Sequence, residues 1–394
     1  MRSLFAMASA AAVTLYECAA AALLGAVLFS ISAAYAACKM LFRAPFARGR
    51  MVHGALQKSG WSLRLVASSM STLGSSFGEK AKSKGKVEEE LWVREQEQMF
   101  RDKKKALPRR VLDAGDVESW ERDGFLRVKN FFTKEETSLL LETIEADSTI
   151  GAQAMPMKDN DGKSSKLTLW FHLGSDTYSA FARSTSLMAA AETLLKDKPY
   201  MFHTKIMLKE PRVGGSWEWH QDFGYWYAQG LLHPDKCMSC ILAVDDHTVE
   251  NGCLQVLRGS HKLGRVEHGI FGEQAGADPS KVSAAQHNQG MELVHCELDA
   301  GDMLFTHSNL LHASAPNNSD GWRRSMIVAY NGCSNQPLVS DGIIPPYSPP
   351  EILPDGDLAS YGVVPHSSDR KDFLSAEKNV ASFDTDDVKI QSGN

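Results

Sequence analysis

The sequence has no excess of basic residues and few cysteines, and both shortages limit what the protein can do. Its 394 residues contain 42 Lys and Arg against 48 Asp and Glu, which gives a formal net charge of −6. A chain with this balance lacks the positive surface that binds nucleic acid, so we expect no nucleic-acid partner. The seven cysteines are an odd number in a chain long enough to build a hydrophobic core without disulfides. We therefore expect mostly free thiols.

Metal-binding and redox motifs built on cysteine are also scarce. Cys237 and Cys240 form a CxxC motif, but no second pair stands at the spacing of a zinc finger and no thioredoxin-like context surrounds it. We interpret the motif as the start of a strand with buried thiols. No internal repeat is visible, so nothing indicates a solenoid or propeller.

Charge is nearly absent near the amino terminus, where Glu17 is the only charged residue between Phe5 and Cys38. Residues 18–38 are uncharged and approach the length of ~20 apolar residues that spans a bilayer. Two interpretations stay open. One is a single membrane anchor followed by a basic flank, and the other is a cleaved organelle-targeting sequence, for which Ala34-Tyr35-Ala36 has the small-x-small form. The location we expect is therefore a membrane or an organelle.

Composition divides the chain into four parts. We expect a hydrophobic anchor or targeting segment over residues 1–50 and a polar, charged linker over 51–113. A folded domain is expected over 114–350, and a proline-rich, polar composition predicts an extended and disordered tail over 351–394.

The folded part begins with helices and continues with short strands. Gly124 ends a first predicted helix, and the pattern of leucines and caps predicts helices over 135–145 and 184–195. Short segments rich in β-forming residues, separated by turn residues, predict strands over 166–170, 201–209, 217–222, 238–245, 253–257, 293–298, 303–307 and 325–330. This order indicates an α+β, mainly β fold with a jelly-roll core and flanking helices.

His220 and Asp222 are the first candidate metal ligands. In an extended strand, residues two apart point to the same face, so this pair can bind one metal ion. Two histidines and one carboxylate, with the other positions open, suit a non-haem Fe(II) that also binds O2 and a co-substrate. The sequence must then supply a second histidine from a later strand.

Residues 302–317 offer that histidine as either His307 or His312. Just downstream, Arg323 and Ser325 share one face of the next predicted strand. A guanidinium binds a carboxylate through two parallel hydrogen bonds and stays charged, so this pair suits the distal carboxylate of 2-oxoglutarate.

These residues, taken together, resemble the phytanoyl-CoA dioxygenase family of Fe(II)- and 2-oxoglutarate-dependent oxygenases, from about Val117 to Asn331. In that family the distal histidine precedes the co-substrate arginine by eleven positions, and here 323 − 312 = 11. The resemblance therefore implies His220, Asp222 and His312 as catalytic metal ligands and Arg323 as the co-substrate anchor. It implies a double-stranded β-helix, with Ser314 and Ser325 assisting at the carboxylate. The motifs that carry it are Glu121-Arg122-Asp123-Gly124-Phe125, His220-x-Asp222, residues 251–262 and residues 312–317 followed by Arg323.

Three lysines near these strands are further candidates for an acidic ligand. Lys166 is included among the expected co-substrate residues, and Lys205 and Lys209 flank a strand before the metal pair. The alternative for each is a solvated edge position.

The resemblance also bears on the reaction. Relatives that halogenate have a small residue in place of the carboxylate, so Asp222 favours hydroxylation of an aliphatic C–H bond, coupled to decarboxylation of 2-oxoglutarate to succinate. The other function classes are a catalytically silent, membrane-tethered binding barrel and a cupin-type metalloenzyme that does not use 2-oxoglutarate.

Aromatic residues after the metal pair are the candidate substrate contacts. By alternation, Trp217 and Trp219 should point away from the metal, whereas Phe223, Tyr225, Trp226 and Tyr227 follow the strand and line the mouth. The expected substrate is a small molecule or an acyl-CoA-type compound. A cation–π pocket for a quaternary ammonium or zwitterionic compound is a further hypothesis.

Overall fold

The computed structural model describes residues 108–271, 273–338, 346–367 and 369–374. The predicted apolar segment over 18–38 and nearly all of the predicted linker lie outside the described residues. Among the helices that the structure describes, none has the length and apolar character needed to cross a membrane. The anchor and the targeting sequence therefore stay predictions.

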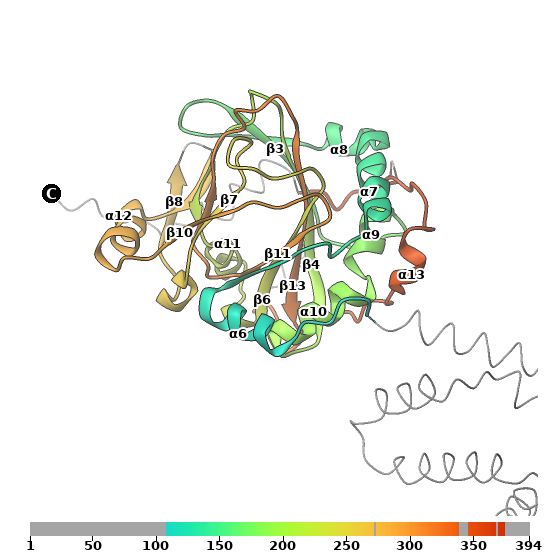
Figure 1. The fold of residues 1–394 in the computed structure, drawn as a ribbon, viewed down its shortest axis with the longest axis horizontal. Coiled ribbons are helices and arrows are strands. Elements are labelled where there is room, and N and C mark those ends of the chain that lie inside the picture. Colours follow the sequence, from blue (N-terminus) through green and yellow to red (C-terminus); the bar gives the residue numbers. More distant parts are fainter. Residues whose placement is uncertain (1–107, 272, 339–345, 368, 375–394) are drawn as a thin grey trace, which may run out of the picture. The chain divides into compact units, whose positions relative to one another are not determined.

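Two antiparallel sheets form the body of the domain (Figure 1). The larger sheet has seven strands in the order β1-β11-β6-β13-β4-β3-β2, and the smaller has four in the order β10-β7-β12-β5. A separate hairpin, β8–β9, lies between β7 and β10 in the chain. Within the larger sheet the strands are β1 (Phe125–Val128), β2 (Met155–Lys158), β3 (Ser164–Trp170), β4 (Pro199–Lys209), β6 (Cys237–Ala243), β11 (Met303–His307) and β13 (Arg323–Gly332). The others are β5 (Trp217–His220), β7 (Leu254–Leu257), β8 (His268–Phe271), β9 (Gln274–Ala277), β10 (Leu293–Cys296) and β12 (His312–Ser314).

Alternation along the central strands divides the core into two layers. On β13, Met326 and Val328 pack with the helices, whereas Ile327 lies on the opposite face, against the smaller sheet. On β6, Leu242 faces the helices and Ile241 faces the smaller sheet in the same way. Because both faces of these strands are covered, the run from Met326 to Tyr330 on β13 and most of β6 are apolar. Ser239 and Ser325 are buried exceptions on the inner face.

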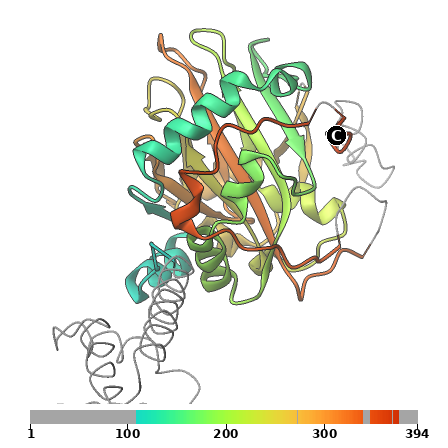
Figure 2. The ribbon, with the colours of Figure 1, turned by 90° about the vertical axis from the view of Figure 1, so that its right-hand side faces the viewer.

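Helices cover the outer face of the larger sheet (Figure 2). The helix α7 begins with a capping box, in which the Thr133 side chain accepts from the Glu136 amide and the Glu136 side chain accepts from the Thr133 amide. The helix α6 ends at Gly124, which has a left-handed φ of 78°. The helices that pack on this face are α6 (Ala114–Asp123), α7 (Lys134–Ala146), α8 (Ser148–Ala152), α9 (Thr177–Ala182), α10 (Thr185–Leu195) and α13 (Asp355–Leu358). Two more, α11 (Asp222–Ala228) and α12 (Pro279–Ser283), contribute to other clusters.

The segment after residue 350 differs from the disordered tail that its composition predicts. Asp355 accepts hydrogen bonds from the amide of Ser186 at 2.9 Å and from that of Arg109 at 2.8 Å. Farther along, the buried His366 donates its amide to Asp147 at 3.0 Å and its ring packs on Trp170. Ser186, Asp147 and Trp170, which are buried, thus hold Asp355 and His366 against the domain, and the count of apolar residues in this segment did not predict these contacts. The rest of the predicted tail lies outside the described residues.

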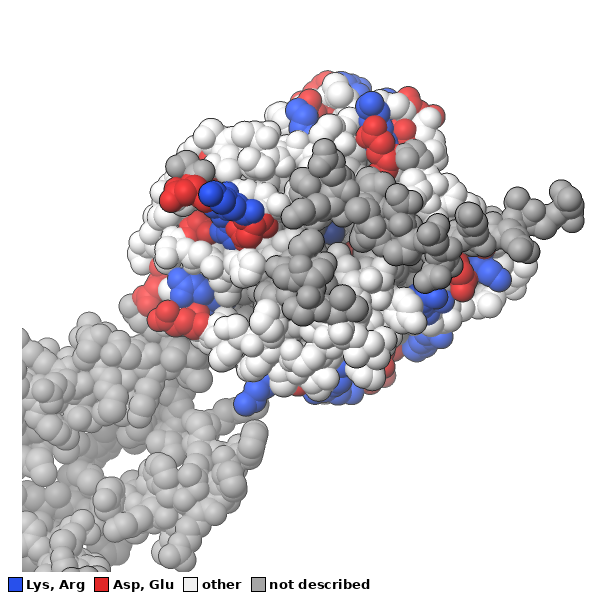
Figure 3. All heavy atoms as spheres, turned by 180° about the vertical axis from the view of Figure 1, so that it is seen from behind, with Lys and Arg blue, Asp and Glu red and all other residues white. Residues whose placement is uncertain are grey.

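Charged side chains on the visible surface occur in mixed groups. Figure 3 shows basic and acidic residues beside one another on the face that it presents, without a broad patch of one sign. This distribution agrees with the absence of a basic surface in the composition.

Candidate metal centre and co-substrate pocket

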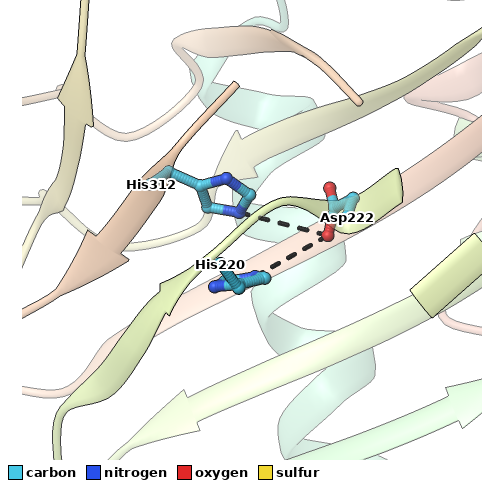
Figure 4. A group of neighbouring side chains, drawn as sticks. All are labelled: His220, Asp222 and His312. Atoms are coloured by element: carbon cyan, nitrogen blue, oxygen red, sulfur yellow. Dashed lines mark ion pairs between the residues drawn. The ribbon is translucent and has the colours of Figure 1, made fainter. Parts of the chain in front are cut away.

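Three buried side chains meet between the two sheets and can hold one metal ion (Figure 4). Each of His220, Asp222 and His312 offers one ligand atom, and these atoms lie within 4.8 Å of one another. Asp222 Oδ1 is 3.8 Å from His220 Nε2 and 4.0 Å from His312 Nε2. The separations leave room for an ion between the three atoms, and the donor set of two imidazoles and one carboxylate fits Fe(II).

Backbone carbonyls fix the orientation of both imidazoles. His220 Nδ1 lies 2.8 Å from the carbonyl oxygen of Glu218, and His312 Nδ1 lies 2.9 Å from that of Leu310. A carbonyl oxygen can only accept, so each Nδ1 is the protonated nitrogen and each Nε2 keeps its lone pair for a metal. This tautomer is the one that the site requires.

Strand pairing brings the two histidines together. On adjacent antiparallel strands, His312 of β12 pairs with His220 of β5, and their ring centroids are 4.0 Å apart. Asp222, however, does not belong to the strand that the sequence predicted over 217–222. The strand β5 ends at His220, and Asp222 is the first residue of α11. The turn into a helix thus directs the carboxylate back toward the imidazoles.

The charge states of the ligands match those that a divalent metal needs. Burial lowers the pKa of His220 and of His312 below the usual range, which keeps both imidazoles neutral. Burial alone would raise the pKa of Asp222, but the ammonium of Lys205 and the hydrogen bond from Ser239 are among the contacts that hold it below its usual value. Neutral imidazoles and an ionised carboxylate are the metal-binding forms.

A cavity joins the metal ligands to Arg323. Its lining includes the three ligands together with Ser314 and Arg323. The guanidinium is buried; Nη2 donates to the Gly252 carbonyl at 2.9 Å and Nη1 lies 3.2 Å from Ser325 Oγ. Of the co-substrate residues inferred from the sequence, the structure therefore brings Arg323 and Ser314 to the cavity of the metal triad, and Ser325 lies behind Arg323. The remaining residues that line the cavity are Lys205, Met207, Trp217, Ser239, Ile241, Leu254, Ala313 and Ile327.

Lys166 lies apart from this cavity. Its ammonium pairs with Glu210 and its side chain is 45% exposed. Lys166 is solvated, as the alternative expected, but it lies on β3 between β4 and β2 and not at the edge of the sheet.

Trp217 is on the opposite side from the one that strand alternation predicts. Its side chain lines the cavity, and its ring centroid is 6.3 Å from that of His220. The register explains the difference, since Ser314 and His312 are two residues apart on β12 whereas their partners Trp217 and His220 are three apart on β5. This bulge adds one residue, which interrupts the alternation and places Trp217 and His220 on the same face.

The four aromatic residues after the metal pair lie on α11, and the helix directs them into different surroundings. Phe223 and Trp226 are buried in a cluster with Phe202 and Leu231, and Tyr227 is 45% exposed beneath the guanidinium of Arg265. Tyr225 alone of the four has its ring near a metal ligand, with a centroid 5.8 Å from that of His220. None of the four belongs to the lining of the cavity that holds the triad. Their contacts are those of core and surface residues, with Tyr225 nearest the metal ligands.

Three polar residues at the site were given no role by the sequence analysis or were treated as edge positions. Ser239 donates to Asp222 Oδ2 at 2.6 Å. Lys205 Nζ lies 3.9 Å from Asp222 Oδ1, and the fully buried Lys209 donates from Nζ to Ser314 Oγ at 2.8 Å. Alternation along β4 could have shown from the sequence that Lys205 and Lys209 share a face. Only the pairing of Lys209 with Arg323 shows that this face points into the domain.

Comparisons with known proteins were made on the sequence and on the fold. The sequence matches the family described as phytanoyl-CoA dioxygenase (PhyH) over residues 120–325. Ectoine dioxygenase of Bordetella bronchiseptica is 25% identical over 245 residues, which cover 57% of this chain and 77% of that protein. L-proline trans-4-hydroxylase of Streptomyces griseoviridis is 25% identical over 268 residues, covering 63% of this chain and 94% of that protein.

A solved structure shares the fold. EctD from S. alaskensis in its apo form superposes with a TM-score of 0.50 at 22% identity, over 61% of this chain and 86% of that chain. The same protein has been solved with bound Fe and, separately, with 2-oxoglutarate and 5-hydroxyectoine.

Proposed function

Because the chain belongs to the phytanoyl-CoA dioxygenase family, we propose that it hydroxylates an aliphatic C–H bond of a small molecule. It is a 2-oxoglutarate-dependent dioxygenase with Fe(II) as its metal, as its relatives and the buried His-Asp-His triad indicate together. The proposal concerns the substrate class, a small molecule, and the hydroxylation of its C–H bond.

The observation that carries the proposal is the single cavity that contains both the metal ligands and Arg323. The proposed roles follow from this arrangement. His220, Asp222 and His312 would hold the metal, and Arg323 would bind the distal carboxylate of 2-oxoglutarate with the help of Ser314 and Ser325. When bound, Fe(II) supplies oxidation of the substrate by O2, coupled to conversion of 2-oxoglutarate to succinate and CO2.

The protein's own residues orient the reactants and keep water out. Arg323 is buried and already held by the Gly252 carbonyl, so a carboxylate meets a guanidinium that needs little reorganisation. Met207, Ile241, Leu254 and Ile327 provide apolar walls beside the metal ligands. A dry wall strengthens the attraction between Arg323 and the carboxylate.

The test is an assay of succinate formation by the full chain, reconstituted with Fe(II) under anaerobic conditions and then exposed to O2. We expect succinate to depend on 2-oxoglutarate and to disappear in His220→Ala, Asp222→Ala and His312→Ala. Arg323→Ala should raise the 2-oxoglutarate concentration needed for half-maximal rate. Normal succinate production by any of the ligand variants would contradict the assignment.

The substrate is sought with ectoine, L-proline and phytanoyl-CoA, the compounds after which similar proteins are named. Stimulation of succinate formation, with a hydroxylated product detected by mass spectrometry, identifies the class. Oxidation without 2-oxoglutarate would instead support a cupin-type enzyme. Ligand binding with no turnover of any compound would support the silent barrel.

A further inference from the structure

Lys205 brings a positive charge to the metal end of the cavity. It lies on β4, lines the cavity with the triad, and its side chain is 17% exposed. Within the described part of the chain its ammonium has no hydrogen-bond acceptor, and its ion-pair partner there is Asp222, whose Oδ1 is 3.9 Å away. The ammonium is not among the buried atoms without a partner, so it keeps access to the open part of the cavity, where it can donate to a polar group of a bound molecule.

Asp222 does not supply that partner once a metal is present. Its Oδ1 faces the Nε2 atoms of both histidines and is therefore the oxygen available to the metal. Its Oδ2 accepts from Ser239. With both oxygens committed, the ammonium of Lys205 stays available to a molecule in the cavity.

The cation of Lys205 is separate from the one that binds the distal carboxylate. On β13, Arg323 pairs with Lys209, whereas Ile327 pairs with Lys205, four residues farther along. Four residues of strand span about 13 Å. The four C–C bonds between the two carboxyl carbons of 2-oxoglutarate, at about 1.5 Å each, reach about 5 Å. The two cations therefore enter the cavity from backbone positions that are well apart, and they face different carboxylate groups, either the two of one 2-oxoglutarate reached by the long side chains or one of it and one of a substrate.

We propose that Lys205 is a second carboxylate-binding residue, which holds a carboxylate group beside the metal through a charge-assisted hydrogen bond. This inference rests on the proposed function and names the chemistry of a ligand for it. The carboxylate has two possible sources, a substrate that is itself a small carboxylic acid or the metal-side carboxylate of 2-oxoglutarate. Both sources require the same contact, and the apolar lining around Lys205 strengthens it.

The experiment compares the full-length wild type with Lys205→Met, which keeps the length of the side chain but removes its charge, and with Lys205→Arg, which keeps the charge. Each protein is loaded with Fe(II) anaerobically, and binding of 2-oxoglutarate is measured by calorimetry. With 2-oxoglutarate bound, binding of L-proline and ectoine is compared with that of L-prolinamide, which lacks the carboxylate. Lys196→Met is the control, because that lysine is 66% exposed and paired with Glu121.

Two results support the proposal and distinguish the sources of the carboxylate. Weaker binding of a carboxylate probe by about tenfold or more in Lys205→Met, with 2-oxoglutarate binding unchanged, assigns Lys205 to the substrate. A loss of similar size for 2-oxoglutarate assigns it to the co-substrate. In either case Lys205→Arg should recover part of the affinity, and L-prolinamide should bind no more weakly to Lys205→Met than to the wild type.

The proposal is wrong if Lys205→Met binds 2-oxoglutarate and every carboxylate probe as the wild type does. It is also wrong if the variant loses only affinity for Fe(II), since Lys205 would then act on Asp222 alone. Neither result touches the proposed function, which fails separately if the wild type forms no succinate.

Discussion

Ser239 is the residue through which the metal site can be tested without removing a ligand. Its hydroxyl is buried on β6 and donates to Asp222 Oδ2 at 2.6 Å, which holds the carboxylate with Oδ1 toward the histidines. In Ser239→Ala, Oδ2 loses its partner and the carboxylate can rotate. Removing such a supporting contact typically weakens metal affinity by about 10- to 100-fold. Leaving the buried acceptor unpaired costs about 1–3 kcal/mol of folding free energy as well.

The assay must separate the loss of metal from a general loss of stability. Affinity for Fe(II) is measured anaerobically by competition with a chelator, and stability by urea unfolding of the metal-free protein. Ser165→Ala is the matched control, since Ser165 is equally buried and donates to the Gly215 carbonyl at 2.8 Å. We expect both variants to be destabilised and only Ser239→Ala to lose metal affinity. Equal Fe(II) affinity in the two variants would refute the positioning role of Ser239.

Two further predictions concern stability. Burial alone would raise the pKa of Asp147, but contacts with His366 and the Thr149 amide lower it from 3.8 to about 2. The ionised form is therefore favoured in the folded state, so its stabilisation of about 2 kcal/mol is fully present above pH 4 and is lost as the pH falls through about 2. Urea unfolding as a function of pH should show a shallower acid loss in Asp147→Asn, and identical slopes would contradict this. Gly252→Ala should unfold at clearly lower urea than Gly264→Ala, because both glycines have a φ of 77° but only at Gly252 would a Cβ meet the Ala315 carbonyl oxygen, at 2.1 Å.

Local patterns in the sequence determined most of the secondary structure. The strands predicted over 303–307 and 201–209 correspond to β11 and β4, and the helix predicted over 184–195 corresponds to α10. The buried residues of these elements recur with the period of a strand or of a helix, and this period is visible in a single sequence. The hairpin β8–β9 and the short strand β12 were missed because Gly269 and Gly276 and a three-residue strand carry little periodic signal.

The metal ligands and the co-substrate residues could be predicted where the residue types and their order in the sequence indicate their chemistry. The ligand types in His220 and Asp222, the later histidine, and Arg323 with its neighbouring serine follow from what iron and a dicarboxylate require. The choice of His312 over His307 came from the family resemblance. In the structure, His312 is a member of the triad, whereas His307 pairs with Asp235 at 3.1 Å.

Only the tertiary structure decided which other side chains, some of them distant in sequence from the ligands, line the metal site. The bulge in β5 turned Trp217 inward, and the register of β4 with β13 placed Lys205 in the cavity. The register of β3 with β4 set Lys166 opposite Leu208, outside the cavity. The sequence by itself determined the types of the metal ligands, because ligand chemistry depends on residue type, and its resemblance to a family selected His312. It did not determine the lining of the cavity, because the direction of a side chain depends on strand register, which pairing with distant residues sets.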